Sequence, residues 1–256
     1  MEDYNINPFS IGGNNYLISG AASGIGRATS ILLSKLGANL ILADIDSHGL
    51  DETKSNCKKT DLVLVLDLTK PSLIKNAVAD KVSGFGKLNG FVHLAGIPYI
   101  SPLKSISEEK CTEVYTVNTY SAIELAKVFS NKNIFSGQKG SIVFISSIYG
   151  LVGSAANVGY AMSKAALHGI TKSLAIELAP KKIRVNCIAP GFVNTKMGTG
   201  IKSMFDEAHS NTLEKLHPLG LGDADDVASV IVFLLSEAAK WITGTVLSVD
   251  GGFTAQ

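Results

Sequence analysis

Seven short runs of aliphatic and β-branched residues recur along the chain, and glycine turns or helix-length segments separate them. The runs lie at residues 15–18, 39–43, 62–66, 90–94, 141–145, 183–188 and 245–249. Runs that are apolar at nearly every position are typical of strands buried on both faces, as in a parallel sheet. This feature constrains the fold most, because consecutive parallel strands must be joined by long crossovers, which are usually helices.

Helix-length segments with apolar residues at positions i, i+3 and i+4 occupy most of the intervals between the runs. They lie at residues 25–36, 72–82, 117–129, 160–178 and 225–235. The alternation indicates a single-domain Rossmann-type α/β fold over residues 1–256, a doubly wound parallel sheet of about seven strands with helices on both faces. The irregular segment 192–222 predicts a substrate loop or lid above that sheet.

Charge, cysteine usage and the first residues exclude several classes of protein. The 23 Lys and Arg residues nearly balance the 22 Asp and Glu residues, so neither a nucleic-acid nor a membrane partner is expected. No apolar run is long enough for a transmembrane helix, and residues 1–15 lack the features of a secretory signal. The protein is therefore expected in the cytoplasm.

Metal and disulfide chemistry are not expected. The three cysteines are widely separated and form no CxxC pair, which argues against a disulfide framework or a zinc site. His209 and His217 have no metal-ligand partners at useful spacing. Both histidines are expected at the surface or in a loop.

A glycine-rich turn connects the first apolar run to the first predicted helix. Its residues include Gly20, Ser23, Gly24, Ile25 and Gly26. Unpaired N–H groups and the positive end of a helix dipole make such a turn an anion site that suits a pyrophosphate. The turn therefore predicts dinucleotide binding. The alternative is that the glycines only allow close packing of the strand and helix.

An acidic residue, Asp44, follows the second apolar run and lies 18 residues after Gly26. A carboxylate at this place can accept hydrogen bonds from both ribose hydroxyls of an adenosine, and it would repel a 2′-phosphate. No Arg or Lys stands at Ser23 or Ile45 to bind such a phosphate. The pattern favours NAD(H) over NADP(H). The alternative is that Asp44 is only a polar strand-end residue or a helix cap.

Motifs along nearly the whole chain resemble those of the short-chain dehydrogenase/reductase family. The glycine turn is similar to the family's TGxxxGxG, with Ser19 in place of Thr, and Tyr160 to Lys164 reads YxxxK. Pro190-Gly191 and residues 248–252 also fit the family pattern. The resemblance implies an oxidoreductase that moves a hydride between a nicotinamide cofactor and a secondary alcohol or ketone. The catalytic residues that it implies are Asn118, Ser147, Tyr160 and Lys164. Besides the glycine turn and Asp44, the cofactor contacts that it implies are Asp67, Leu68, Ala95, Gly96, Tyr160, Lys164, Pro190, Gly191, Val193 and Thr195.

The spacing of the predicted catalytic residues makes chemical sense. Tyr160 and Lys164 are four residues apart, so they share one face of a helix. A neighbouring ammonium stabilises a phenolate, so we expect Lys164 to lower the pKa of Tyr160 toward the working pH. Ser147 would then hydrogen-bond the substrate oxygen. The resemblance implies that Lys164 also binds the nicotinamide ribose and that Asn118, at the start of a helix, supports a water in a proton relay.

One stretch departs from the family pattern. His93-Leu94-Ala95-Gly96 stands where the family usually has Asn-Asn-Ala-Gly, and His93 could replace one of the two lost amide hydrogen bonds while Leu94 cannot. A structural role for His93 is favoured over a catalytic one.

Three interpretations of the function, and one of the assembly, follow from the resemblance. The nearest subgroups are the 3-oxoacyl-carrier-protein reductases and the sugar or polyol dehydrogenases. Because the former typically use NADPH, an NADPH-linked acyl-carrier reductase is the alternative to an NAD(H) enzyme, and a non-catalytic nucleotide sensor is a second. Family members commonly form tetramers, so a homotetramer is expected, with a homodimer as the alternative.

Overall fold

The computed structural model describes residues 7–57, 61–202 and 213–256, with only the backbone described for Thr199, Ile201 and Lys202. Seven parallel strands form one sheet in the order β3-β2-β1-β4-β5-β6-β7. The strands are β1 Asn15–Ser19, β2 Asn39–Asp44, β3 Leu62–Val65, β4 Gly90–His93, β5 Gly140–Ile145, β6 Ile183–Pro190 and β7 Val246–Val249. The predicted doubly wound α/β fold is confirmed, and each predicted strand differs from the observed one by at most a few residues.

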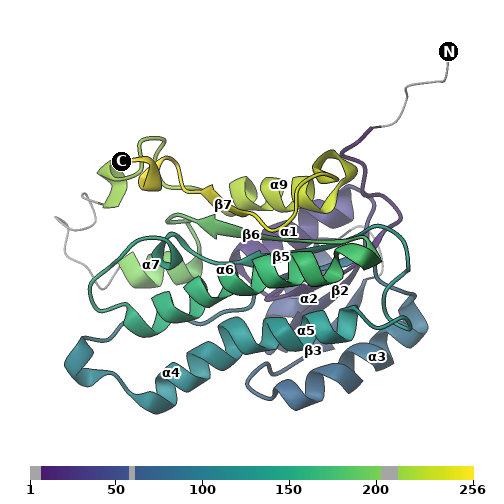
Figure 1. Cartoon of the computed structure of the whole chain (residues 1–256), viewed down its shortest axis with the longest axis horizontal. Helices are drawn as coiled ribbons and strands as arrows, with labels where there is room; N and C mark the ends of the chain where they lie inside the picture. Colours follow the sequence, from purple (N-terminus) through teal and green to yellow (C-terminus); the bar gives the residue numbers. More distant parts are fainter. Residues whose placement is uncertain (1–6, 58–60, 203–212) are drawn as a thin grey trace.

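Helices cover both faces of the sheet (Figure 1). One face carries α1 Gly24–Lys35, α2 Ser47–Ser55 and α9 Ala224–Leu235, and the other carries α3 Ile74–Phe85, α5 Ser121–Phe129 and α6 Val158–Leu178. Two further helices, α4 Glu108–Tyr115 and α7 Lys196–Lys202, lie beyond the carboxyl ends of the strands. No helix in these described ranges is both long enough and apolar enough to cross a membrane.

The core has two apolar layers, one on each side of the sheet. Leu17 and Phe91 belong to the layer under α3, α5 and α6, whereas their neighbours Ile18 and Val92 belong to the layer under α1 and α9. Successive strand residues point to opposite faces, so a strand covered on both sides must be apolar at every position. This requirement explains the continuous apolar runs of the sequence.

The helices α2, α4 and α7 have no counterpart among the predicted helical segments. The sequence of α2 is mostly polar and buries only Gly49, Leu50 and Thr53, and α4 buries only Val114. Such short helices show little apolar periodicity, so the pattern on which the prediction rests is absent. The third, α7, falls within the segment 192–222, and residues 203–212 of that predicted lid lie outside the described part of the chain.

The strand order reverses between β1 and β4. From this point the chain runs outward through β2 and β3 on one side and through β5, β6 and β7 on the other. The loops that follow β1 and β4 therefore leave in opposite directions, and they open a crevice at the carboxyl edge of the sheet, where ligands of open α/β sheets bind.

Candidate active site

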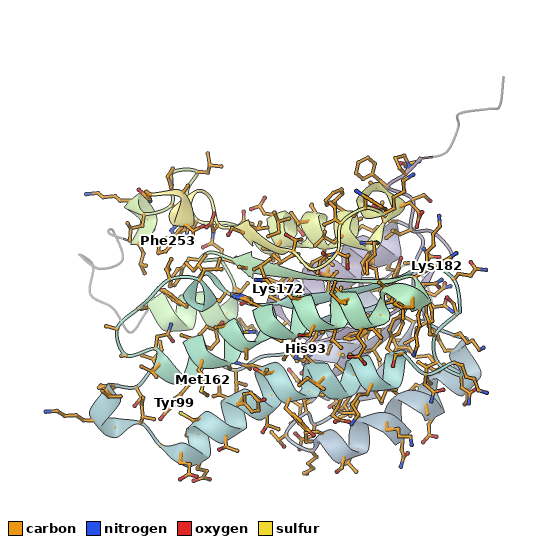
Figure 2. The ribbon with its side chains drawn as sticks, in the orientation of Figure 1. His93, Tyr99, Met162, Lys172, Lys182 and Phe253 are labelled. Atoms are coloured by element: carbon orange, nitrogen blue, oxygen red, sulfur yellow. The ribbon has the colours of Figure 1, made fainter. Side chains whose placement is uncertain are left out.

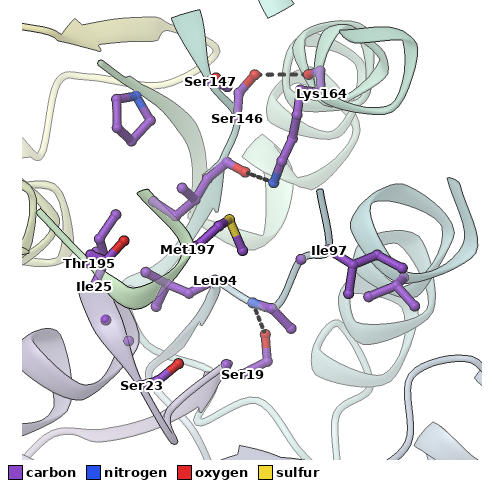
Figure 3. Close-up of a pocket in the computed structure, with 18 of the residues that line it drawn as sticks. Ser19, Ser23, Ile25, Leu94, Ile97, Ser146, Ser147, Lys164, Thr195 and Met197 are labelled. Atoms are coloured by element: carbon purple, nitrogen blue, oxygen red, sulfur yellow. Dashed lines mark hydrogen bonds between the residues drawn. The ribbon is translucent and has the colours of Figure 1, made fainter. Parts of the chain in front are cut away.

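A cavity of about 460 Å³ lies at this carboxyl edge and reaches from the end of β3 to the loop after β6 (Figure 3). The structure brings together in its wall every residue predicted to contact a cofactor: Gly20, Ser23, Gly24, Ile25, Gly26, Asp44, Asp67, Leu68, Ala95, Gly96, Tyr160, Lys164, Pro190, Gly191, Val193 and Thr195. Ser147 also lines the cavity. Asn118 does not, because it is fully buried behind the wall.

The glycine turn after β1 is shaped by close backbone contacts. Gly20 has a φ of +75°, and a Cβ atom there would lie 2.6 Å from the backbone nitrogen of Ala95. A Cβ on Gly26 would lie 1.9 Å from the carbonyl oxygen of Gly20. Any larger residue would therefore push the turn apart.

The turn leaves the start of α1 open toward the cavity. Ser23 precedes α1 with an extended backbone, and its side chain makes no capping hydrogen bond. Gly24, Ile25 and Gly26, the first residues of α1, line the cavity. Backbone N–H groups at a helix start that no side chain caps can bind an anion. This cradle fits the pyrophosphate of a dinucleotide.

Asp44 lies at the end of β2 with its carboxylate held by two backbone N–H groups. The N–H of Ala22 donates to Oδ2 and the N–H of Asp46 donates to Oδ1, both at a distance of 3.1 Å. These two hydrogen bonds fix the orientation of the Asp44 carboxylate in the cavity wall.

Arg27 directly follows the glycine turn, and its guanidinium already has hydrogen-bond partners within the protein. Arg27 donates to Oε2 of Glu52 at 2.7 Å, to the Ala22 carbonyl at 2.5 Å and to Oγ1 of Thr53 at 3.1 Å. The sequence did not predict this network, because Glu52 and Thr53 lie on α2, which the apolar pattern does not reveal.

Ser147 and Tyr160 meet at the carboxyl end of β5. Ser147 begins a short 3₁₀ turn, Ile148–Gly150, and its Oγ accepts the N–H of Tyr149 at 3.2 Å. The same hydroxyl forms a hydrogen bond with the phenol of Tyr160, which lies in the first turn of α6. Two side chains that are distant in sequence thus converge on one point of the cavity wall.

Lys164 lies one helical turn after Tyr160 and is almost completely buried, with 4% of its surface exposed. Its Nζ donates to the carbonyl of Ile145 at 2.8 Å, a hydrogen bond of Lys164 that Figure 3 marks with a dashed line. The same nitrogen lies 5.8 Å from the centre of the Tyr160 ring. Burial disfavours the ammonium and lowers the pKa of Lys164 to about 8. The amine can therefore gain or lose a proton near neutral pH.

Tyr160 keeps its proton in this environment. Burial raises the pKa of its phenol to about 12 and outweighs the opposing effect of the hydrogen bond from Ser147. The prediction that Lys164 lowers this pKa is therefore wrong for the structure as it stands. The physical reason is that desolvation penalises the phenolate, while the charge of Lys164 is itself disfavoured by burial. At neutral pH the phenol is a proton donor.

Asn118 lies in a single π-helical turn, Thr116–Tyr120, that joins α4 to α5. The expectation that Asn118 begins a helix is wrong, because α4 precedes it without a break. Its Oδ1 accepts the N–H of Ile97 at 2.8 Å. Its Nδ2 donates to the Ile97 carbonyl and to Oγ of Ser163, both at a distance of 3.0 Å. Single π turns of this kind often occur at functional sites. Asn118 thus ties the loop after β4 to the helix that carries Tyr160 and Lys164.

His93 is buried at the end of β4, with 1% of its surface exposed (Figure 2). Its Nδ1 lies 2.8 Å from Oγ of Ser19, and its Nε2 lies 3.3 Å from Oγ of Ser121. Because Ser121 donates its hydroxyl proton to the Val117 carbonyl, the ring must donate from Nε2 and accept at Nδ1. The imidazole therefore links β1, β4 and the π turn, which is a structural role.

The pKa of His93 predicts a measurable loss of stability in acid. Burial lowers this pKa from 6.5 to about 3, so the stability that the neutral imidazole contributes is present above pH 6.5 and falls as the pH drops toward 3. Between pH 7 and pH 5 the loss is about 2 kcal/mol. Urea unfolding of the wild type and of His93→Asn at both pH values should show the wild type losing about this much more. An equal loss in both proteins would contradict the prediction.

One histidine matches the expectation only in part. His217 lies in a loop, as one of the two expected positions had it, but it is buried, with 3% of its surface exposed, and packs beside Phe192 near the cavity. No local pattern signals this burial, because it depends on contacts with residues that are distant in sequence. His209 lies outside the described residues.

Comparison with known proteins agrees with this geometry. The family model described as "Enoyl-(Acyl carrier protein) reductase" matches residues 20–254. The 3-oxoacyl-[acyl-carrier-protein] reductase FabG of Thermotoga maritima is 37% identical over 241 residues, which cover 92% of this chain and 96% of that protein.

Solved structures are similar over nearly their whole length. A putative 2-deoxy-D-gluconate 3-dehydrogenase from Agrobacterium tumefaciens, with bound NADP, superposes with a TM-score of 0.90 and 31% identity, covering 98% of this chain and 100% of that one. 4-Hydroxyisoleucine dehydrogenase complexed with NADH gives a TM-score of 0.88 and 30% identity, covering 95% and 99%. The chain belongs to the short-chain dehydrogenase/reductase family and is an NAD(P)-dependent oxidoreductase.

Proposed function

We propose that this protein uses NAD(H) to interconvert a secondary alcohol and a ketone, with Tyr160 as the general acid and base. The observation that carries the proposal is the convergence of Ser147, Tyr160 and Lys164 on one cavity that also contains the glycine turn and Asp44. A dinucleotide would place its adenosine ribose at Asp44, its pyrophosphate at the start of α1, and its nicotinamide beside Tyr160.

The bound nicotinamide would supply or accept the hydride. The side chains of the chain itself handle the proton. Tyr160 holds a proton on its phenol oxygen at neutral pH, so it can donate that proton to the oxygen of a ketone as the hydride arrives. Ser147 hydrogen-bonds the same phenol and would orient the substrate oxygen toward it.

Two buried residues, Lys164 and Asn118, support this proton transfer. The pKa of Lys164, lowered to about 8, lets its amine carry or release a proton in the working range of pH. Asn118 holds the backbone of Ile97 on the opposite side of the same wall. With its proton in place at neutral pH, Tyr160 is in the protonation state that ketone reduction requires of a general acid.

Asp44 supports NAD(H) as the preferred cofactor. Its carboxylate faces the cavity where the adenosine ribose would lie, and the guanidinium of Arg27 is paired with Glu52. A 2′-phosphate would meet the negative charge of Asp44 at this place. Similar structures do not decide between the cofactors, since one holds NADP and another holds NADH.

A second candidate is an NADPH-linked 3-oxoacyl-carrier-protein reductase. The identity of 37% to the Thermotoga maritima reductase favours an acyl substrate. In either case, residues of the segment 192–222, among them Phe192 and Met197 of the cavity wall, would contact the substrate.

The proposal is tested by following the absorbance of NADH and of NADPH with a panel of ketones. The panel contains 3-oxoacyl thioesters, sugar-derived ketones and simple cyclic ketones. Oxidation of NADH by one class supports the proposal and identifies the substrate chemistry. Oxidation of NADPH alone with 3-oxoacyl thioesters would support the second candidate instead. Binding of NADH without turnover on any ketone would favour a nucleotide sensor.

We also propose a homotetramer built through α6 and the β7 edge of the sheet. Ile176 of α6 has 78% of its surface exposed, and Leu247 of β7 has 37% exposed. Apolar side chains exposed on a regular helix and an edge strand suit contacts with other copies. Light scattering at micromolar concentration should give about four times the chain mass of 26.9 kDa. A monomer mass would contradict this assembly.

A further inference from the structure

A buried histidine joins the loop after β6 to the segment that precedes α9. His217 has its Nδ1 2.7 Å from the Leu213 carbonyl, and its Nε2 accepts the backbone N–H of Phe192 at 3.1 Å. A carbonyl can only accept and a backbone N–H can only donate, so the ring carries its proton on Nδ1. The contacts therefore require one tautomer of a neutral imidazole.

Aromatic packing extends this link to the cavity on one side and to the end of the chain on the other. The His217 ring lies 6.0 Å from the ring of Phe192 and 4.9 Å from that of Phe253. Phe192 in turn packs edge-on against Tyr149, two residues after Ser147, with ring centres 6.0 Å apart. Tyr149 and Phe192 both line the cavity. Phe253, whose ring packs against His217, is labelled in Figure 2.

Both polar groups of the Phe192 backbone, its N–H and its carbonyl, form hydrogen bonds with the segment 213–222. Its N–H donates to His217, and its carbonyl accepts the N–H of Gly222 at 3.0 Å. The adjacent Asn194 donates its N–H to the Gly222 carbonyl at 2.8 Å. The loop that follows β6 is therefore fixed by hydrogen bonds from a part of the chain about twenty-five residues away.

Close packing leaves this loop little freedom to take another position. A Cβ atom on Gly191 would lie 2.9 Å from Nε2 of His217 and 2.9 Å from Cα of Asp250. The Asp250 carboxylate accepts the N–H groups of Gly252 and Thr254, and it also accepts the hydroxyl of Thr254. At this place the N–H of Phe192 donates to Nε2 of His217.

We propose that His217 is a positioning residue that holds the loop 190–195 in the shape needed for the nicotinamide half of the cofactor. This inference rests on the proposed function, in which that half lies beside Pro190, Gly191, Val193 and Thr195. Without the imidazole acceptor, the N–H of Phe192 is left unpaired in a tightly packed place, and the loop shifts to satisfy it. The adenosine half would bind at Asp44, at the end of β2, which lies on the other side of the reversal in strand order from β6. Binding of that half should therefore not depend on His217.

The test compares two ligands that share the adenosine half. NADH and ADP-ribose are titrated by calorimetry into the wild type, His217→Phe and His217→Gln. Phenylalanine keeps the ring packing and removes both nitrogens, whereas the amide of glutamine can accept from Phe192 and donate to the Leu213 carbonyl. We expect His217→Phe to weaken NADH binding about tenfold with ADP-ribose binding unchanged, and His217→Gln to recover most of the loss.

A surface variant of the same segment is the control for this test. Leu219→Gln changes a side chain that is 88% exposed, and it should bind both ligands as the wild type does. Equal weakening of NADH and ADP-ribose in His217→Phe, or no weakening of either, would overturn the role of His217. Failure of His217→Gln to recover NADH binding would overturn the hydrogen bond as its cause. A wild type that binds neither ligand would instead overturn the proposed function.

Discussion

Replacing Tyr160 with phenylalanine should lower kcat for ketone reduction at least a hundredfold, with the Kd for NADH within about twofold of the wild type. The substitution removes one oxygen and keeps the ring that packs in the cavity wall. The proton that the phenol holds at neutral pH, as its pKa of about 12 requires, would then have to come from water. Steady-state absorbance gives kcat, and fluorescence titration gives the Kd.

A second tyrosine provides the matched control for this experiment. Tyr115 ends α4 with 37% of its surface exposed, and it does not line the cavity. Tyr115→Phe should therefore leave kcat unchanged, and it shows the effect of losing a hydroxyl elsewhere. A Tyr160→Phe variant that turned over at nearly the wild-type rate would exclude Tyr160 as the general acid.

Replacing Asp44 with asparagine should shift the preference for NADH over NADPH about a hundredfold toward NADPH. The amide keeps the size of the carboxylate and one oxygen for the N–H of Ala22, which now donates to Oδ2. It loses the negative charge that repels a 2′-phosphate, and it weakens the charge-assisted hydrogen bonds that a ribose would make. Both effects reduce the ratio of the two affinities, which calorimetric titration with each cofactor measures.

The environment of Asp44 limits how far the preference can move. Arg27 is paired with Glu52, so loss of the Asp44 charge does not by itself release the Arg27 guanidinium to bind the 2′-phosphate. We therefore expect Asp44→Asn to become tolerant of NADPH rather than specific for it. Asp46→Asn, which changes the neighbouring helix cap, is the control and should keep the original ratio. A wild type that binds NADPH as tightly as NADH would overturn the assignment of NAD(H).

Local patterns in the sequence were sufficient to predict the sheet and most of the cavity wall. The continuous apolar runs predicted all seven strands, because residues covered on both faces must be apolar regardless of the details of packing. The glycine turn, Asp44 and the spacing of Tyr160 and Lys164 are also local, and the strand ends carry them to one edge of the sheet. Each of these features depends on neighbours within a few residues, or on the direction of one strand.

Other properties of the site were decided by the tertiary structure. The raised pKa of Tyr160 and the lowered pKa of Lys164 result from burial among distant segments, which no local pattern reports. Asn118 lies in a π turn that Ser163 of α6 contacts, and His93 bridges Ser19 and Ser121. Desolvation and hydrogen bonding between segments depend on which parts of the chain meet, so they are determined only once the sheet and its helices have assembled.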